Sequence, residues 1–135
     1  MRFIMDATEV MILHTNGNVG IGETNPQSKL AVNGTVTTKE VVVTDVGWSD
    51  FVFEDDYALM PLEEVERYID EHGHLPEIPS AAEIQANGAK LGEMQAKLLQ
   101  KIEELTLYLM EQNKQMEALK AALQDVQARQ ETSLQ

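Results

Sequence analysis

Residues 98–126 read LLQKIEELTLYLMEQNKQMEALKAALQDV, within a run of about 40 residues from Leu91 onward that has no proline and one glycine, Gly92. Apolar side chains recur in this run at alternating steps of four and three residues, which is the heptad spacing of a coiled coil. With Ile102 at heptad position a, the a and d residues are Leu91, Leu98, Ile102, Leu105, Leu109, Gln112, Met116, Leu119, Leu123 and Val126. At about 1.5 Å per residue we expect a helical rod of roughly 60 Å.

Gln112 is the one polar residue inside this stripe, whose two ends carry Gln95 and Gln130 at position a. A polar side chain in an otherwise apolar seam is more often a device for register than a binding site. Misaligned chains would bury its amide group without a hydrogen-bond partner. We therefore expect Gln112 to set the alignment of the chains.

The stripe indicates self-association rather than packing on the chain's own core, because the rest of the chain offers too little apolar surface to cover so long a helix. Met94, Leu99 and Tyr108 widen the apolar face over the first half of the helix. A broad stripe with leucine at most core positions does not strongly favour two strands. We therefore expect a parallel homotrimer with the a and d residues at its interface.

Residues 1–47 consist of short β-branched runs separated by turn signals, such as Asn16-Gly17 and Asn33-Gly34. The candidate strands are residues 3–5, 10–14, 19–21, 29–32 and 38–44. Strands this short bury too little surface to form a stable sheet alone, so we expect partner chains to supply the missing layer. The expected fold class is α+β: an intertwined homotrimer with a short-stranded β stalk end, then small helices, then a parallel trimeric coiled coil.

Residues 17–22 read GNVGIG, which invites comparison with a phosphate-binding loop. Such loops need the spacing Gly-x-Gly-x-x-Gly between a strand and a helix. The spacing differs here, and no helical pattern follows before Pro26. We expect these glycines to allow tight turns or a close backbone approach instead.

A helix of about twelve residues is predicted from Pro61, which suits a first helical position, to a stop at Gly73. Leu62, Val65 and Ile69 share one face of this helix at spacings of three and four residues. It follows an aromatic and acidic packing arm with the sequence WSDFVFEDDY.

Residues 74–80, HLPEIPS, predict an extended connector, because a proline disfavours the α conformation for the residue before it. Ser80 and Glu83 have the spacing of a capping box, which opens a second short helix. Asn87-Gly88 is expected to close that helix.

The charge balance excludes several partners. The chain has 10 Lys and Arg against 23 Asp and Glu, a net charge of −13, and residues 48–90 alone hold eleven acidic residues and two basic ones. This balance repels phosphate backbones and anionic membrane surfaces, so we expect no nucleic-acid partner. No run of 18 apolar residues exists, so we expect no membrane insertion. Asp6 and Glu9 interrupt the first 13 residues, so any export signal is expected outside this chain.

The acidic segment is interpreted as a solvated face. The alternative, a site for calcium or a cationic partner, has weak support, because Glu54-Asp55-Asp56 lacks the spacing that wraps oxygen ligands around a cation.

The chain has no cysteine, so it has no disulfide and no thiol nucleophile. His72 and His74 could form a metal pair, but Gly73 ends the predicted helix between them, so their imidazole rings need not converge. We expect no catalytic residue, no metal ligand and no cofactor.

Three blocks of the sequence carry a resemblance: NGNVGIGETNPQSKLAVNGTV at residues 16–36, WSDFVFEDDYALMPLEEVERYIDEHGHLPEIPSAAEI at 48–84, and LGEMQAKLLQKIEELTLYLMEQNKQMEAL at 91–119. In this order they resemble the C-terminal regions of trimeric tail-fibre-like proteins of phages and of bacterial surface or secreted proteins. The layout is similar to that of endosialidase-type intramolecular chaperone domains. The resemblance implies an intertwined homotrimer that serves fibre assembly.

The chain departs from that family at one point. Members that cleave themselves carry a Ser-Asp pair followed within a few residues by a lysine, which acts as the base for the serine nucleophile. Here Ser49-Asp50 is followed by FVFE, and the next lysine is Lys90. Because Ser49 has no base near it in the sequence, we expect a retained end without proteolytic activity, and not an enzyme.

The expected function is structural: a module that trimerises and registers the C-terminal end of a tail-fibre-like or surface fibre protein and assists its folding. Its partners are then further copies of itself and the upstream fibre segments. Its location is extracellular or on the surface of a virion or injection particle. Alternatives are a fibre tip that binds a receptor or glycan and, behind it, a self-cleaving chaperone. The domains expected are a β stalk segment at 1–47, an acidic arm with short helices at 48–90, and the trimerisation helix at 91–135.

Overall fold

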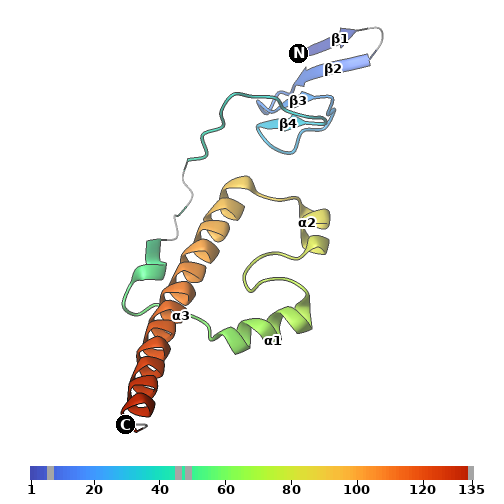
Figure 1. Ribbon diagram of the computed structural model, residues 1–135. Helices are drawn as coiled ribbons and strands as arrows, with labels where there is room; N and C mark the ends of the chain where they lie inside the picture. The colour runs from blue at the N-terminus through green and yellow to red at the C-terminus, as the bar shows by residue number, and fades with distance from the viewer. Residues whose placement is uncertain (6–7, 45–46, 48–49, 134–135) are drawn as a thin grey trace. The chain divides into compact units, whose positions relative to one another are not determined.

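The computed structural model describes residues 1–5, 8–44, 47 and 50–133. It is an α+β structure with a small four-stranded sheet and a long C-terminal helix, as the sequence predicts (Figure 1). The chain divides into two units, Met1–Val42 and Val43–Gln135, which are described separately below.

The first unit is built on one sheet. Its strands are β1 (Arg2–Met5), β2 (Thr8–Leu13), β3 (Val19–Ile21) and β4 (Leu30–Val32), and they lie in that order. The β1–β2 and β2–β3 pairs are antiparallel, whereas β3 and β4 are parallel. Ile12 and Pro26 are the buried apolar side chains among those whose burial is described in this unit, which is very little core for a sheet.

A tight loop allows β3 and β4 to be parallel without a crossover helix. Gly22 has a φ of +63°, and a Cβ atom at Gly20 would lie 1.9 Å from the carbonyl oxygen of Glu23. Asn18 fastens the loop by donating from Nδ2 to the carbonyl oxygen of Pro26 at 3.0 Å. The expected close backbone approach is therefore confirmed at Gly20.

The predicted strand at residues 38–44 is wrong. No strand is assigned to this segment, although Val41, Val42 and Val43 are exposed apolar residues of the kind that strands favour. A strand exists only when its backbone groups pair with a neighbouring strand. None of the four described strands pairs with this segment, so its β-propensity is not satisfied within one chain.

The second unit contains a short 3₁₀ helix η1 (Asp50–Phe53) and the helices α1 (Leu62–His72), α2 (Ala81–Asn87) and α3 (Leu91–Ser133). The end of α1 at Gly73, in the left-handed conformation, confirms the prediction, while Pro61 lies just before the helix rather than inside it.

The start of α2 also follows the prediction. Its first turn is held by the capping box: the Ser80 backbone N–H donates to Glu83 Oε2 at 2.7 Å, and the Glu83 backbone N–H donates to Ser80 Oγ at 3.3 Å. Both bonds satisfy backbone donors that a helix start otherwise leaves free.

The connector at residues 74–80 was expected to be extended, but it turns at Pro76-Glu77. That prediction is therefore wrong for the middle of the connector. Glu77 has a φ of +64°, the one positive φ of a non-glycine residue in the described part of the chain. The proline rule restricts Leu75 and Ile78, which precede prolines, and places no restriction on Glu77. A left-handed non-glycine residue costs about 1–3 kcal/mol, so its surroundings must hold it in place.

Candidate functional site

The ion pairs along the helix α3 contribute little to its stability. The helix runs for 43 residues and carries ion pairs along its surface, such as Lys120 with Glu117 at 2.8 Å and Arg129 with Asp125 at 2.7 Å. Pairs at this spacing support an isolated helix by only about 0.2–0.5 kcal/mol each, so most of the stability of α3 must come from packing.

The heptad stripe forms one face, and that face is open. Its apolar side chains are between 49% and 71% exposed, and Gln112 is exposed with them. The structure places on this face Leu91, Leu98, Ile102, Leu105, Leu109, Gln112, Met116, Leu119, Leu123 and Val126. We call this face the seam.

The opposite face of α3 is covered over its first half by the chain itself. Ala96 and Gln100 are buried, and Glu103 and Leu107 are half-buried. These residues occupy heptad positions b and f, which point away from the axis of a coiled coil. The 3₁₀ helix η1 packs against α3 and buries Val52 to 1% exposure. The chain thus covers the outer face of α3 and leaves the seam free.

A polar cluster ties three segments of the chain together on this outer face. Gln100 Nε2 lies 2.6 Å from Glu77 Oε2, 3.0 Å from Glu104 Oε1 and 3.3 Å from the hydroxyl of Tyr57, so its two hydrogens are shared among three acceptors. The Tyr57 hydroxyl donates to Glu104 Oε1 at 2.6 Å. Lys101 Nζ bonds both carboxylates, at 2.8 Å to Glu77 and 2.9 Å to Glu104. We call these five residues the polar clamp.

The polar clamp holds the turn of the connector. Lys97 Nζ donates to the backbone carbonyl oxygen of Glu77 at 2.8 Å, while Gln100 and Lys101 bond its carboxylate. Three donors from successive turns of α3 therefore converge on one residue. These bonds account for the left-handed backbone of Glu77, because the strain is local and the contacts that offset it come from another element.

The pKa values of the clamp reflect this arrangement. Desolvation opposes ionisation of Glu104, but hydrogen bonds from Tyr57, Lys101 and Gln100 outweigh it and lower the pKa of that carboxyl group. Desolvation also opposes the charge on Lys101, and its bonds to Glu77 and Glu104 outweigh that effect and raise its pKa. Desolvation and the bond to Glu104 raise the pKa of Tyr57. Lys101 and Glu104 thus remain a charged pair, with each side chain only 12% exposed.

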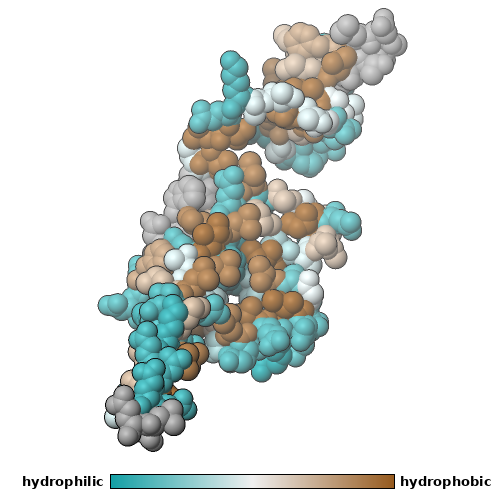
Figure 2. Space-filling view, viewed as in Figure 1, coloured by the Kyte–Doolittle hydropathy of each residue, from teal (hydrophilic) through white to brown (hydrophobic). Residues whose placement is uncertain are grey.

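An apolar groove lies beside the clamp, between α1 and α3. Its volume is about 210 Å³, and its lining comes from the segment before α1, from α1, from the connector and from α3, which contributes Lys101, Glu104, Leu105 and Tyr108. Within this lining, the Tyr108 hydroxyl donates to the carbonyl oxygen of Met60. Figure 2 shows hydrophobic side chains gathered around the first half of α3, whereas the outer edge of α1 is hydrophilic.

His72 and His74, considered above as a metal pair, are engaged in ring packing and contacts with backbone carbonyl groups. The ring of His72 stacks on Tyr68 at 4.1 Å between ring centroids, and the rings of His72 and His74 are 6.1 Å apart. The Nδ1 atom of each is within hydrogen-bond distance of a backbone carbonyl oxygen. In the described part of the chain, no three His, Asp or Glu side chains gather as a metal-binding group.

Sequence reasoning missed the polar clamp. Its members lie between 23 and 47 residues apart across segments, and Gln100 occupies an f position, where a polar residue is ordinary. The spacing of Gln100, Lys101 and Glu104 by three and four residues on one helix was the available signal, although it marks any solvated helix face equally well. Ser49, considered above as a nucleophile, lies outside the described residues.

No helix within the described ranges is long and apolar enough to cross a membrane. The comparisons with known proteins leave the chain unassigned: no family model matches it, and no match is found among the curated proteins or the solved structures.

Proposed function

We propose that this chain is a structural trimerisation and registration module at the C-terminal end of a tail-fibre-like or surface fibre protein. The observation that carries the proposal is the division of α3 into an outer face covered by its own chain and a seam left open. A helix that has already buried one face and still presents nine large apolar side chains at heptad spacing is suited to bind further copies of itself.

Burial of the seam favours association of the chains. Fully burying a large aliphatic side chain is worth about 1.5–3 kcal/mol relative to exposure. Each chain has nine such side chains along the seam, and most of them are more than half exposed to water. Association must overcome the loss of translational and rotational freedom, about 4–15 kcal/mol, which a seam of this length can offset.

Three copies suit both halves of the molecule. The width of the stripe near Leu99 and Tyr108 favours more neighbours than a two-stranded coil provides, since additional helices cover a broader face. The coil also raises the effective concentration of the β segments of the three chains. Residues 38–44 carry exposed valines without a strand partner in their own chain, and we assign neighbouring chains or upstream fibre segments as that partner.

The solution mass of the chain tests this proposal. Light scattering should give three times 15.1 kDa at micromolar concentration. Leu123→Asp places a charge in the seam at position a, whereas Ala121→Asp places it at the outer position f, and both residues are exposed in the single chain. We expect the first variant to dissociate and the second to keep the wild-type mass. A wild-type monomer, or equal masses for the two variants, would contradict the proposal.

A further inference from the structure

We propose that η1 of each copy packs against α1 and the apolar groove of the next copy, so that the trimer is interlocked outside its coiled coil. This inference rests on the proposed trimer and identifies a second contact within it. It follows from which flank of α3 each element covers.

The groove and α1 lie on one flank of the seam. The α3 side chains that line the groove are Lys101, Glu104, Leu105 and Tyr108, at heptad positions g, c, d and g. The bond from Tyr108 to Met60 anchors the start of α1 on the same side. These elements therefore flank position g, and Leu105 makes the groove continuous with the seam.

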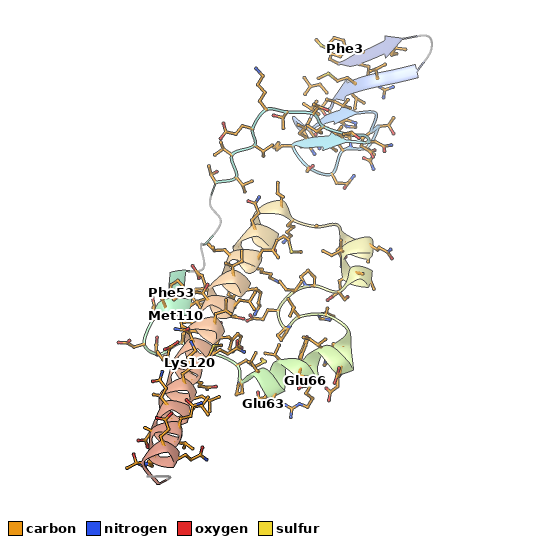
Figure 3. The ribbon with its side chains drawn as sticks, viewed as in Figure 1. Phe3, Phe53, Glu63, Glu66, Met110 and Lys120 are labelled. Atoms are coloured by element: carbon orange, nitrogen blue, oxygen red, sulfur yellow. The ribbon has the colours of Figure 1, made fainter. Side chains whose placement is uncertain are left out.

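We place the short helix η1 on the other flank, because α1 and the groove occupy the g flank. It packs against α3, and half-buried α3 residues outside the groove include Leu99 and Glu103, at positions e and b. Figure 3 shows Phe53 on the side of α3 away from Glu63 and Glu66 of α1. The chain thus crosses the outer face of α3 between η1 and α1, with Tyr57 bonded to Gln100 and Glu104 on the way.

The geometry of a parallel coiled coil brings these two flanks together. Positions e and g of one helix face positions g and e of its neighbours. In a three-fold ring the e flank of every chain meets the g flank of the next, and this head-to-tail contact closes after three copies. Because η1 marks the e flank and the groove marks the g flank, each η1 faces the groove of the adjacent copy.

The surfaces that meet are both apolar and incompletely covered. Phe51 and Phe53 of η1 are 43% and 58% exposed, and Leu62 and Ile69 of α1 are 45% and 40% exposed. Contiguous exposed apolar patches mark interaction sites, and each aromatic side chain can bury about 150–250 Å². The ring contact uses all three η1 helices and all three grooves.

Disulfide trapping tests the contact, because the native chain has no cysteine. Phe53→Cys combined with Leu62→Cys should give a covalent trimer on a non-reducing gel, since only a bond from every chain to the next links all three. The matched control combines Phe53→Cys with Glu64→Cys, on the opposite face of α1, and should give no covalent trimer. Phe51→Cys with Leu62→Cys is a second pair, for use if the first variant is not trimeric when reduced.

The outcomes separate this contact from the trimer itself. A covalent trimer from either η1 pair, without one from the control, supports the docking of η1 on the next copy. Trimeric mass by light scattering without cross-linking, or with equal cross-linking of the control, overturns the η1 contact and leaves the proposed function standing. A monomeric mass for the wild-type chain overturns both.

Discussion

The hydroxyl of Tyr57 donates a 2.6 Å hydrogen bond to Glu104, which lies 47 residues further along the chain. This bond joins the segment before α1 to the outer face of α3. It does so beside a carboxylate that is itself paired with Lys101. The bond therefore holds the cover on α3 by a charge-assisted contact in a partly buried site.

Removal of this bond should loosen the cover. Tyr57→Phe deletes the donor and leaves the ring, so we expect a loss of about 1.5–3 kcal/mol, the usual value for a hydrogen bond to a charged group. The melting temperature at fixed protein concentration measures the change. Tyr68→Phe is the matched control, because the Tyr68 ring stacks on His72 and its loss of a hydroxyl should leave the melting temperature unchanged. Equal effects of the two substitutions would show that the Tyr57 bond contributes nothing.

The clamp should also make stability depend on pH. Because the pKa of Glu104 is lowered in the folded chain, its stabilising effect is complete above its ordinary value of 4.5 and is lost as the pH falls through the lowered pKa. Glu104→Gln should therefore lower the melting temperature at neutral pH, and the difference from wild type should shrink below about pH 4.5. Glu117→Gln, in an exposed ion pair, serves as the control. A difference that is constant across this range would contradict the assignment.

Truncation tests the role of the seam in protecting the rest of the chain. Deleting residues 112–135 removes Met116, Leu119, Leu123 and Val126, each worth about 1.5–3 kcal/mol when fully buried. We expect the mass by light scattering to fall toward the monomer on dilution, and the unchanged first unit to become more sensitive to protease.

A shorter deletion, of residues 129–135, keeps every apolar residue of the seam and provides the comparison. It should retain the wild-type mass and protease resistance. If the longer truncation remains trimeric at nanomolar concentration, the second half of α3 is not what holds the chains together.

Gly20, in the middle of β3, should tolerate no side chain because the loop after the strand folds back over it. A Cβ atom there would meet the Glu23 carbonyl oxygen at 1.9 Å, so Gly20→Ala must displace the backbone and should cost at least the 1–3 kcal/mol typical of overpacking. Hydrogen exchange of the β3 amides should accelerate. Gly34→Ala, where nothing lies within 4 Å, should change little. Unaltered exchange in the Gly20 variant would mean that the loop adapts at little cost.

The local elements of the fold could be predicted because their signals are local. Gly73 ends α1, and Ser80 with Glu83 opens α2, through bonds between residues within four positions of each other. The strand predicted at residues 38–44 is wrong because its signal is local but its formation is not. β-propensity describes single residues, whereas a strand also needs a neighbouring strand to pair with.

The candidate site was predictable only in part. The seam follows from periodicity alone, since its residues share a face of any helix. The polar clamp does not, because it depends on the turn at Glu77, which brings that carboxylate back to Gln100 and Lys101. No spacing rule connects a left-handed glutamate to two helical side chains that lie more than twenty residues further along the chain.

The cover on the outer face of α3 has a consequence for the thickness of the proposed fibre. A long helix with apolar residues on all sides can add neighbours in every direction, and such helices grow into bundles of no fixed size. Here Ala96 and Gln100 are already buried by the chain's own segment. Lateral growth at that level is therefore blocked from outside, so helices can gather only around one axis. Under the proposed function, an end built in this way would keep each fibre single, even where many fibres stand close together.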